Sequence, residues 1–228
     1  MIAGSLAATP SISIIIPAFH ESGLESITAA FENEPGVEVV FALCLEDLST
    51  RAPEGSVSVR APKGRASQMN AGARASSGEI LLFLHADTRI PPASLGLVRG
   101  ALGRPDVAAG AYLLRVEGEG LWRQFLSAGA NLRSRYLGMP FGDQAIFLSR
   151  EVFQRIGGYE EVPILEDVRL IEEAARIGRI AILPVCAATS ARRWEKGGIV
   201  ATTLRHWGIM IAYKMGVSPR RLARWFNR

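Results

Sequence analysis

The amino-acid sequence predicts an α/β fold in which a mostly parallel central sheet is flanked by helices. In the first half of the chain, short apolar runs typical of strands alternate with stretches typical of helices. The strand-like runs are apolar along their whole length, as expected for parallel strands covered on both faces. With 228 residues, 48% of them hydrophobic, the chain can bury the core of a single domain.

The N-terminal part of the chain predicts strands and helices in strict alternation. The strand-like runs are rich in β-branched residues, and Pro35 and Gly36 close the first helix. The second helix is built from small residues and ends at Gly78. Strands are expected at residues 12–16, 37–44, 57–60 and 79–84, and helices at residues 24–34 and 64–78.

The C-terminal part is less regular, and no linker, repeat or low-complexity segment interrupts it. A helix is expected after Pro91 and Pro92. Further strands are expected at residues 108–116, 145–149 and 180–184, and further helices at residues 121–137, from 150, at 165–177, and once or twice at the end. The single domain therefore spans residues 1–228.

Charge, cysteine content and hydropathy narrow the class of protein. The formal net charge is +4. Cys44 and Cys186 lie too far apart for a redox motif or metal cage, and Cys44 ends an apolar run typical of a buried thiol. Residues 1–19 lack a basic n-region and are interrupted by Pro10, so they do not predict a signal peptide. No run reaches the length of a membrane span, and we expect a cytoplasmic protein.

The C-terminal segment carries apolar residues at helical spacing. Trp207, Ile211 and Met215 recur every four residues, with Trp225 and Phe226 beyond them. Such a stripe is typical of a buried helix face. Nearby arginines also suit a membrane surface, a homodimer contact or simple solvation, and the sequence leaves these alternatives open. The arginines are Arg220, Arg221, Arg224 and Arg228.

Polar clusters follow three of the predicted strands, namely PAFHES, LEDLS and HADT. In open α/β sheets, ligands bind beyond the carboxyl ends of the strands, so these clusters can converge on one ligand. The first turn has no G-x-G-x-x-G pattern and the chain has no P-loop, which excludes the common dinucleotide and nucleoside-triphosphate sites.

Asp87 stands at the exit of the fourth predicted strand, in the segment FLHADT. A carboxylate there can bind Mg²⁺ or Mn²⁺ beside a diphosphate. His85 lies two residues earlier, and alternate residues of an extended segment share a face, so both side chains can reach one ion. The alternative is an aspartate that caps a turn and a histidine that only packs.

Two basic segments suit a phosphate. Lys63 and Arg65 flank Gly64 at a helix start, where free N–H groups and the helix dipole favour an anion. In SARRWEKGG an arginine can meet a phosphate while an aromatic ring stacks on a base or sugar. Ordinary solvated basic residues are the alternative at both places. The second segment contains Arg192, Arg193 and Trp194.

Two acidic segments follow in the second half. Glu166 and Asp167 begin a helix in ILEDV, where a positioned carboxylate can take a proton from a hydroxyl. The alternative is that acids simply stabilise a helix N-terminus. In FGDQ, Asp143 and Gln144 precede a strand and can hydrogen-bond a substrate.

Together these motifs resemble glycosyltransferase family 2 with the GT-A fold, a Rossmann-like fold for nucleotide-diphospho-sugars. The resemblance runs from SIIIPAFHE to at least ARRWEKGG. Pro17, Phe19 and Glu21 match the family's P-x-[YF]-N-E pattern, with His20 in place of Asn. The stretch GRASQMNAGARASSGEILLFLHADT resembles its basic loop, small-residue helix and D-x-D strand. FGDQ, ILEDV and ARRWEK resemble its acceptor loop, its E-D motif and its Q-x-x-R-W element.

The resemblance implies an inverting, metal-assisted hexosyl or related transferase. Residues 10–90 would bind the donor, and residues 91–228 the acceptor. Asp167 would be the general base, and Glu166 would orient it or the acceptor. Gly142, Asp143 and Gln144 would line the acceptor pocket, and Asp87 with His85 would hold Mn²⁺ or Mg²⁺. The donor-binding residues would be Pro17, Ala18, Phe19, Glu21, Glu46, Asp47, Arg65, Asn70, Asp87, Arg192, Arg193 and Trp194.

Two departures from the family pattern shape the expectations. The D-x-D motif reads His85-Ala86-Asp87, and the second-strand motif reads LCLEDLST, with Glu46 or Asp47 as the base-contacting acid. A UDP-sugar is the default donor, the acceptor is open, and no nucleic-acid partner is expected. The alternative function is a nucleotide-sugar-binding protein without turnover. The expected location is the cytoplasm or the inner face of the membrane.

Overall fold

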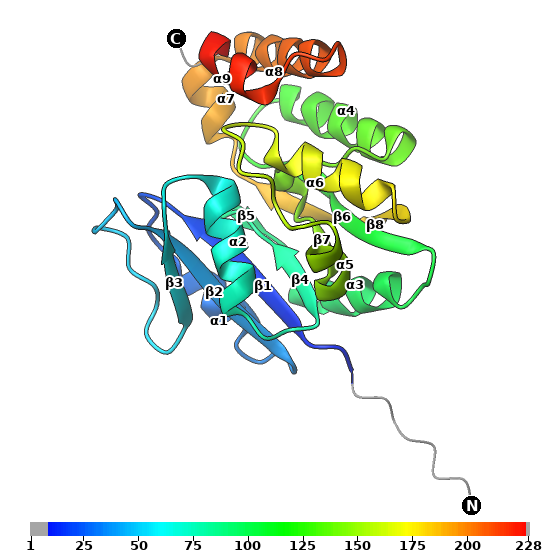
Figure 1. Ribbon diagram of the computed structural model, residues 1–228. Coiled ribbons are helices and arrows are strands. Elements are labelled where there is room, and N and C mark those ends of the chain that lie inside the picture. Colours follow the sequence, from blue (N-terminus) through cyan, green and yellow to red (C-terminus); the bar gives the residue numbers. More distant parts are fainter. Residues whose placement is uncertain (1–8, 227–228) are drawn as a thin grey trace, which may run out of the picture.

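A computed structural model describes residues 9–226, apart from the side chains of Arg193, Lys196 and Phe226. Its centre is a single eight-stranded sheet in the order β3-β2-β1-β4-β7-β6-β8-β5 (Figure 1). The strands are β1 (Ile12–Ala18), β2 (Val37–Cys44), β3 (Val57–Ala61), β4 (Ile80–Phe83), β5 (Thr88–Arg89), β6 (Val107–Val116), β7 (Phe147–Ser149) and β8 (Arg179–Thr189).

The first four strands form the parallel part of the sheet, as the sequence predicts. β1 lies between β2 and β4 and is parallel to both, and β3 is parallel to β2. Every residue of β1 except Pro17 is buried. The predicted fold class is therefore confirmed, because continuous apolar runs do form strands covered on both sides.

The antiparallel strand β7 joins this part to the rest of the sheet. It pairs with β4 on one side and with β6 on the other, both antiparallel. β6 and β8 are parallel, and the short β5 pairs antiparallel with β8 at the far edge. One sheet therefore extends through both predicted halves, and the functional division near residue 90 stays a prediction.

β8 continues beyond Pro184, where the sequence analysis ends the strand. The register with β6 shifts between the pairs Ala111–Ile182 and Leu113–Cys186. Two additional β8 residues are accommodated in this irregularity, and Pro184 lies within it. A proline cannot donate to the ladder, and a bulge is where a strand tolerates it. The strand thereby reaches Thr189 and carries the following segment to the site.

Helices cover both faces of the sheet. α1 (Glu25–Phe31) and α3 (Leu95–Leu102) pack on one face, and α2 (Arg65–Ala75), α5 (Arg150–Arg155) and α6 (Glu166–Ala175) pack on the other. Alternate β1 residues belong to the two cores, Ile14 to the first and Ile15 to the second. A Cβ at Gly72 of α2 would lie 2.5 Å from Ile15 Cγ2, so the small-residue helix does approach the sheet closely.

The remaining helices lie beyond the carboxyl ends of the parallel strands β1 and β4, at the top of the view in Figure 1. They are α4 (Trp122–Leu137), α7 (Arg192–Gly197), α8 (Ile199–Lys214) and α9 (Pro219–Phe226), and two 3-10 turns are η1 (Pro92–Ser94) and η2 (Gly142–Gln144). Among residues 9–226, no helix has the length and apolar character needed to cross a bilayer.

The prediction that the C-terminal apolar stripe is core is wrong. Trp207, Ile211 and Met215 are 59%, 57% and 80% exposed, and Trp225 is 60% exposed. Only Thr202 of α8 is buried. α8 lies against α7, α9 and the cavity described below rather than against the sheet, so helical spacing alone is a poor guide to burial here.

Candidate active site

A cavity of about 860 Å³ lies at the carboxyl ends of β1 and β4, between the sheet and helices α4 and α8. Most of the predicted site residues line it, although they come from distant parts of the sequence. They are Pro17, Phe19, Glu21, Arg65, His85, Asp87, Gly142, Asp143, Glu166, Asp167 and Trp194. The strand-end argument therefore locates the cavity, since β1 and β4 are neighbours in the sheet.

Asp87 lies in a tight turn, and the extended geometry assumed in the sequence analysis is wrong. β4 ends at Phe83, and the Thr88 N–H donates to the His85 carbonyl at 3.0 Å, which closes a turn. Arg192 Nη2 lies 3.5 Å from Asp87 Oδ2 and 3.6 Å from Glu21 Oε2. The arginine therefore links the ends of β1 and β4 to α7.

His85 lies beside η2 (Gly142–Gln144), which is called the Gly142 loop below. A Cβ added to Gly142 would lie 2.9 Å from His85 Nε2 and 3.3 Å from Asp167 Oδ2. A larger residue at position 142 would therefore press on both side chains. His85 and Asp87 therefore have different neighbours, and the described residues contain no group of three His, Cys, Asp or Glu side chains that could hold a metal by itself.

Glu166 and Asp167 begin α6, as the sequence predicts. Asp167 Oδ2 accepts the Gly142 N–H at 2.6 Å, and its Oδ1 accepts the Val168 N–H at 2.8 Å. Glu166 is buried, and its Oε1 lies 3.6 Å from Arg65 Nη1. The first acid therefore faces the basic start of α2, and the second is held against the Gly142 loop.

The backbone is strained at the borders of the cavity. In the described part of the chain, the non-glycine residues with positive φ are His20 (52°), Ala145 (48°) and Leu165 (65°). Each costs on the order of 1–2 kcal/mol relative to glycine. His20 follows Phe19, Ala145 follows the Gly142 loop, and Leu165 precedes Glu166. The concentration of strain beside these segments is typical of functional sites.

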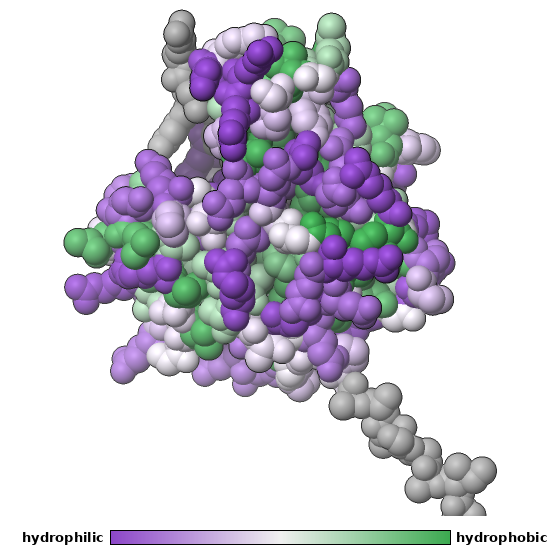
Figure 2. Space-filling view, in the orientation of Figure 1, coloured by the Kyte–Doolittle hydropathy of each residue, from purple (hydrophilic) through white to green (hydrophobic). Residues whose placement is uncertain are grey.

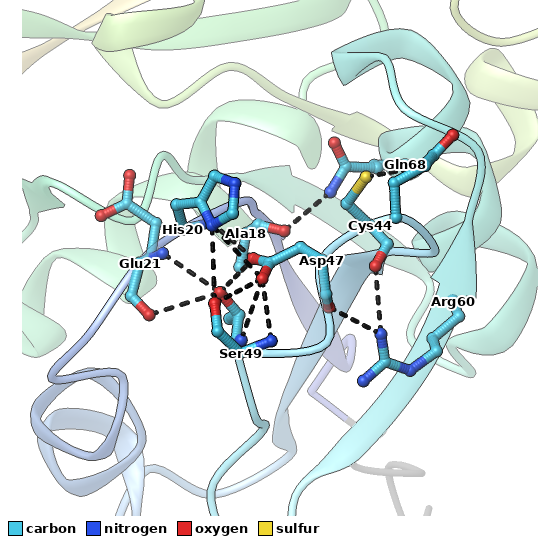
Figure 3. A network of polar contacts seen from close by, with 10 residues as sticks. Ala18, His20, Glu21, Cys44, Asp47, Ser49, Arg60 and Gln68 are labelled. Atoms are coloured by element: carbon cyan, nitrogen blue, oxygen red, sulfur yellow. Dashed lines mark hydrogen bonds and ion pairs between the residues drawn. The ribbon is translucent and has the colours of Figure 1, made fainter.

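Asp47 has a different environment from the one predicted. It is buried and does not line the cavity. It accepts hydrogen bonds from two backbone and two side-chain groups after β2, and from the His20 N–H at 2.6 Å (Figure 3). Its oxygens accept the N–H and O–H groups of both Ser49 and Thr50. Asp47 therefore ties the loop after β2 to the end of β1, and this geometry gives no support for a contact with the nucleobase.

The hydrogen bonds from Ser49 and Thr50 hold the pKa of Asp47 well below its ordinary value. A carboxylate with a lowered folded-state pKa stabilises the fold above its unfolded-state pKa of about 4, and this contribution is lost as the pH falls further. Asp47→Asn should therefore lower the urea midpoint at neutral pH, and its difference from the wild type should shrink below about pH 4. Urea titrations across this range test this, and a constant difference would contradict it.

Four other predicted residues also make contacts within the protein rather than lining the cavity. Glu46 is exposed and accepts from Cys44 Sγ at 2.8 Å, which lowers the pKa of Glu46. Asn70 makes two hydrogen bonds to the Tyr159 backbone. Gln144 is fully buried and bonds to the Tyr112 carbonyl, Ser134 Oγ and the Phe141 N–H. Ala18 is buried and its carbonyl accepts from Gln68.

Arg133 of α4 lines the cavity and is absent from the sequence prediction. Its guanidinium lies 3.5 Å from the centre of the Phe141 ring and donates to the Met139 carbonyl at 2.9 Å. Burial lowers the pKa of Arg133, while Asp143 and Asp167 raise it. No short motif surrounds it, so only the three-dimensional placement of α4 reveals it. Arg193 was also predicted, and its side chain lies outside the described residues.

Comparison with solved structures supports the fold. Staphylococcus aureus TarS residues 1–349 in complex with UDP-GlcNAc has a TM-score of 0.58 and 15% identity, over 79% of this chain and 58% of that chain. S. aureus TarS has a TM-score of 0.56 and 13% identity, over 79% and 37%. A mycobacterial protein has a TM-score of 0.53 and 18% identity, over 80% and 66%. This chain thus spans less than two thirds of each.

No curated protein matches the sequence. The family described as "Glycosyl transferase family 2" matches residues 45–157, about half of the chain. This segment contains α2, the Asp87 turn and the Gly142 loop, which all contribute to the cavity. The solved structures share the fold of this chain, and the family match over residues 45–157 shows that the chain belongs to glycosyl transferase family 2.

Proposed function

We propose that this protein transfers a sugar from a nucleotide-diphosphate sugar to an acceptor hydroxyl with inversion at the anomeric carbon. The observation that carries the proposal is the cavity itself, which joins a cationic end to a carboxylate end. Arg65 and Lys63 line it at the start of α2, and Asp167 lines it at the start of α6. Donor phosphates and an acceptor hydroxyl need this pair of environments side by side.

The donor diphosphate fits the cationic end. The free N–H groups at the start of α2, with Arg65 in its first turn, favour an anion. Lys63 Nζ lies 4.7 Å from the Phe19 ring centre, so a cation and an aromatic face stand together beside β1. The S. aureus TarS structure contains UDP-GlcNAc. A UDP-sugar is therefore the first donor to test.

A divalent ion fits beside Asp87, whose carboxylate lines the cavity and is about one-third exposed. Mg²⁺ and Mn²⁺ often bind through one or two carboxylates together with substrate phosphates, so a dedicated cluster of protein ligands is not needed. When bound, the ion would neutralise charge on the leaving diphosphate. We retain Asp87 as its ligand and not His85, because His85 lies against Gly142 and Asp167.

Asp167 is the proposed general base. Each of its oxygens accepts one backbone N–H, and a carboxylate oxygen has a second lone pair free for a hydroxyl. The acceptor O–H gives its proton to Asp167 while the oxygen bonds to the anomeric carbon. The bond from that carbon to the diphosphate oxygen breaks, and the electron pair leaves with the nucleoside diphosphate. Arg65 and Arg192 stabilise the charge that develops there.

A screen of nucleotide sugars with Mn²⁺ tests this function. We expect release of nucleoside diphosphate from at least one sugar donor, faster for a uridine donor than for the same sugar on another base, and faster with acceptor present. The Asp167→Asn variant is the control for contaminating hydrolases. Tight binding of a nucleotide sugar without any release, with or without acceptors, would instead favour the binding protein without turnover.

A further inference from the structure

Helices α4, α8 and α9 share a one-sided charge. The protein as a whole is nearly balanced, with 26 basic and 22 acidic residues. These three helices contain no aspartate or glutamate. Their basic residues are Arg123, Arg133 and Arg135 on α4, Arg205 and Lys214 on α8, and Arg220, Arg221 and Arg224 on α9. Arg133 lines the cavity and Lys214 pairs with Glu172, while Arg135, Arg220, Arg221 and Arg224 are exposed on these helices.

The same helices expose large apolar side chains. α8 presents a continuous stripe, because successive members are three or four residues apart and fall on one helix face. In the space-filling view, green apolar residues lie beside purple hydrophilic ones at the end of the molecule where α8 and α9 lie (Figure 2). Patches of this kind mark interaction surfaces. The stripe is Val200, Leu204, Trp207 and Ile211, continued by Met215 directly after the helix, and α4, the residue before it and α9 add Leu121, Phe125, Leu132, Tyr136 and Trp225.

This surface borders the cavity. Leu126 and Ala130 of α4 and Trp207 and Met210 of α8 line the cavity, while Leu204 and Ile211 do not. α8 therefore has one side toward the reaction site and another toward solvent. Substitutions at Leu204 and Ile211 change the outer side without altering the cavity lining.

We propose that α4, α8 and α9 form a docking surface for an anionic lipid bilayer. Helices with exposed tryptophan, leucine and isoleucine beside arginine bind at the boundary between headgroups and acyl chains, where apolar burial and attraction to anionic lipid act together. A nucleic acid would use the arginines but not the aliphatic stripe. A symmetric contact between two copies would bring the same cationic patch of each chain together without acids on these helices to offset it.

Sedimentation with vesicles tests the docking surface without requiring turnover. The protein should sediment with vesicles of phosphatidylglycerol and phosphatidylcholine at low salt, and much less with phosphatidylcholine alone or at high salt. Leu204→Glu/Ile211→Glu should weaken binding by at least about tenfold. Leu48→Glu/Leu97→Glu is the matched control, because it changes exposed apolar residues in the same way away from these helices.

The arginines provide an independent test that leaves the apolar stripe intact. Arg220→Gln/Arg221→Gln/Arg224→Gln should weaken binding to anionic vesicles on the order of tenfold or more, with the same thermal unfolding as the wild type. A wild type that ignores anionic vesicles would overturn the proposal. So would a dimer, measured by light scattering, that becomes a monomer in the Leu204→Glu/Ile211→Glu variant and binds no vesicles in either form.

Discussion

Replacing Asp167 with asparagine should lower the rate of sugar transfer by about two to four powers of ten, because general-base assistance is typically worth that much. Asparagine keeps the shape of the side chain but has no basic oxygen to take the acceptor proton. Steady-state transfer rates at saturating donor measure this loss. Donor binding should persist, since the contacts proposed for the diphosphate lie at α2 and Asp87.

The hydrogen bonds of Asp167 require a structural control. Both of its oxygens accept backbone N–H groups, so asparagine must turn its NH₂ toward one of these donors. Thermal unfolding and nucleotide binding will separate loss of the base from loss of the Gly142 loop. Glu166→Gln should be milder, as Glu166 faces Arg65 rather than the loop. Near-normal transfer by Asp167→Asn would show that the base is elsewhere in the cavity.

Asp87→Asn should reduce transfer by about two to three powers of ten, because it removes the proposed ligand of the divalent ion and the partner of Arg192. For the same reason, excess chelator should abolish wild-type activity and Mn²⁺ should restore it. Initial rates across a Mn²⁺ titration measure both effects, and the variant should need more metal for its residual rate.

Asp106→Asn is the matched control for this substitution. Asp106 also pairs with arginines, Arg104 and Arg179, but it lies beside the start of β6, far from the cavity lining. It should keep wild-type activity and metal dependence. Full wild-type turnover in excess chelator would exclude the metal role, and the loss in Asp87→Asn would then be assigned to the Arg192 contact.

The sequence predicts most of the sheet because its strands are strongly apolar and their breaks are marked by proline and glycine. β2 has the predicted bounds, and β1 and β6 differ by one or two residues. β5 is missing from the prediction because two residues carry no periodicity. β8 is predicted too short because Pro184 normally ends a strand, and only its pairing with β6 reveals that it lies in an irregular part of the ladder.

The sequence predicts those site residues that belong to a short motif. It misses those whose role depends on contacts with residues that are distant in the sequence. Asp167 and Gly142 belong to separate motifs that the sequence predicts one by one, and only the structure shows the hydrogen bond that joins them. Asp47 has a plausible position in sequence, yet Ser49 and Thr50 occupy its oxygens. The exposure of Trp207 follows from the placement of α8 beyond the sheet, which helical spacing does not encode.

The position of β7 between β4 and β6 affects how the chain folds during its synthesis on the ribosome. β4, with the sequence ILLF, follows its neighbour β1 out of the ribosome, but its other neighbour, β7 (Phe147–Ser149), emerges much later. Until then the nascent chain presents an apolar strand edge, the kind of surface that joins other chains. A chaperone would therefore protect this protein most between the emergence of β4 and the emergence of β7 from the ribosome.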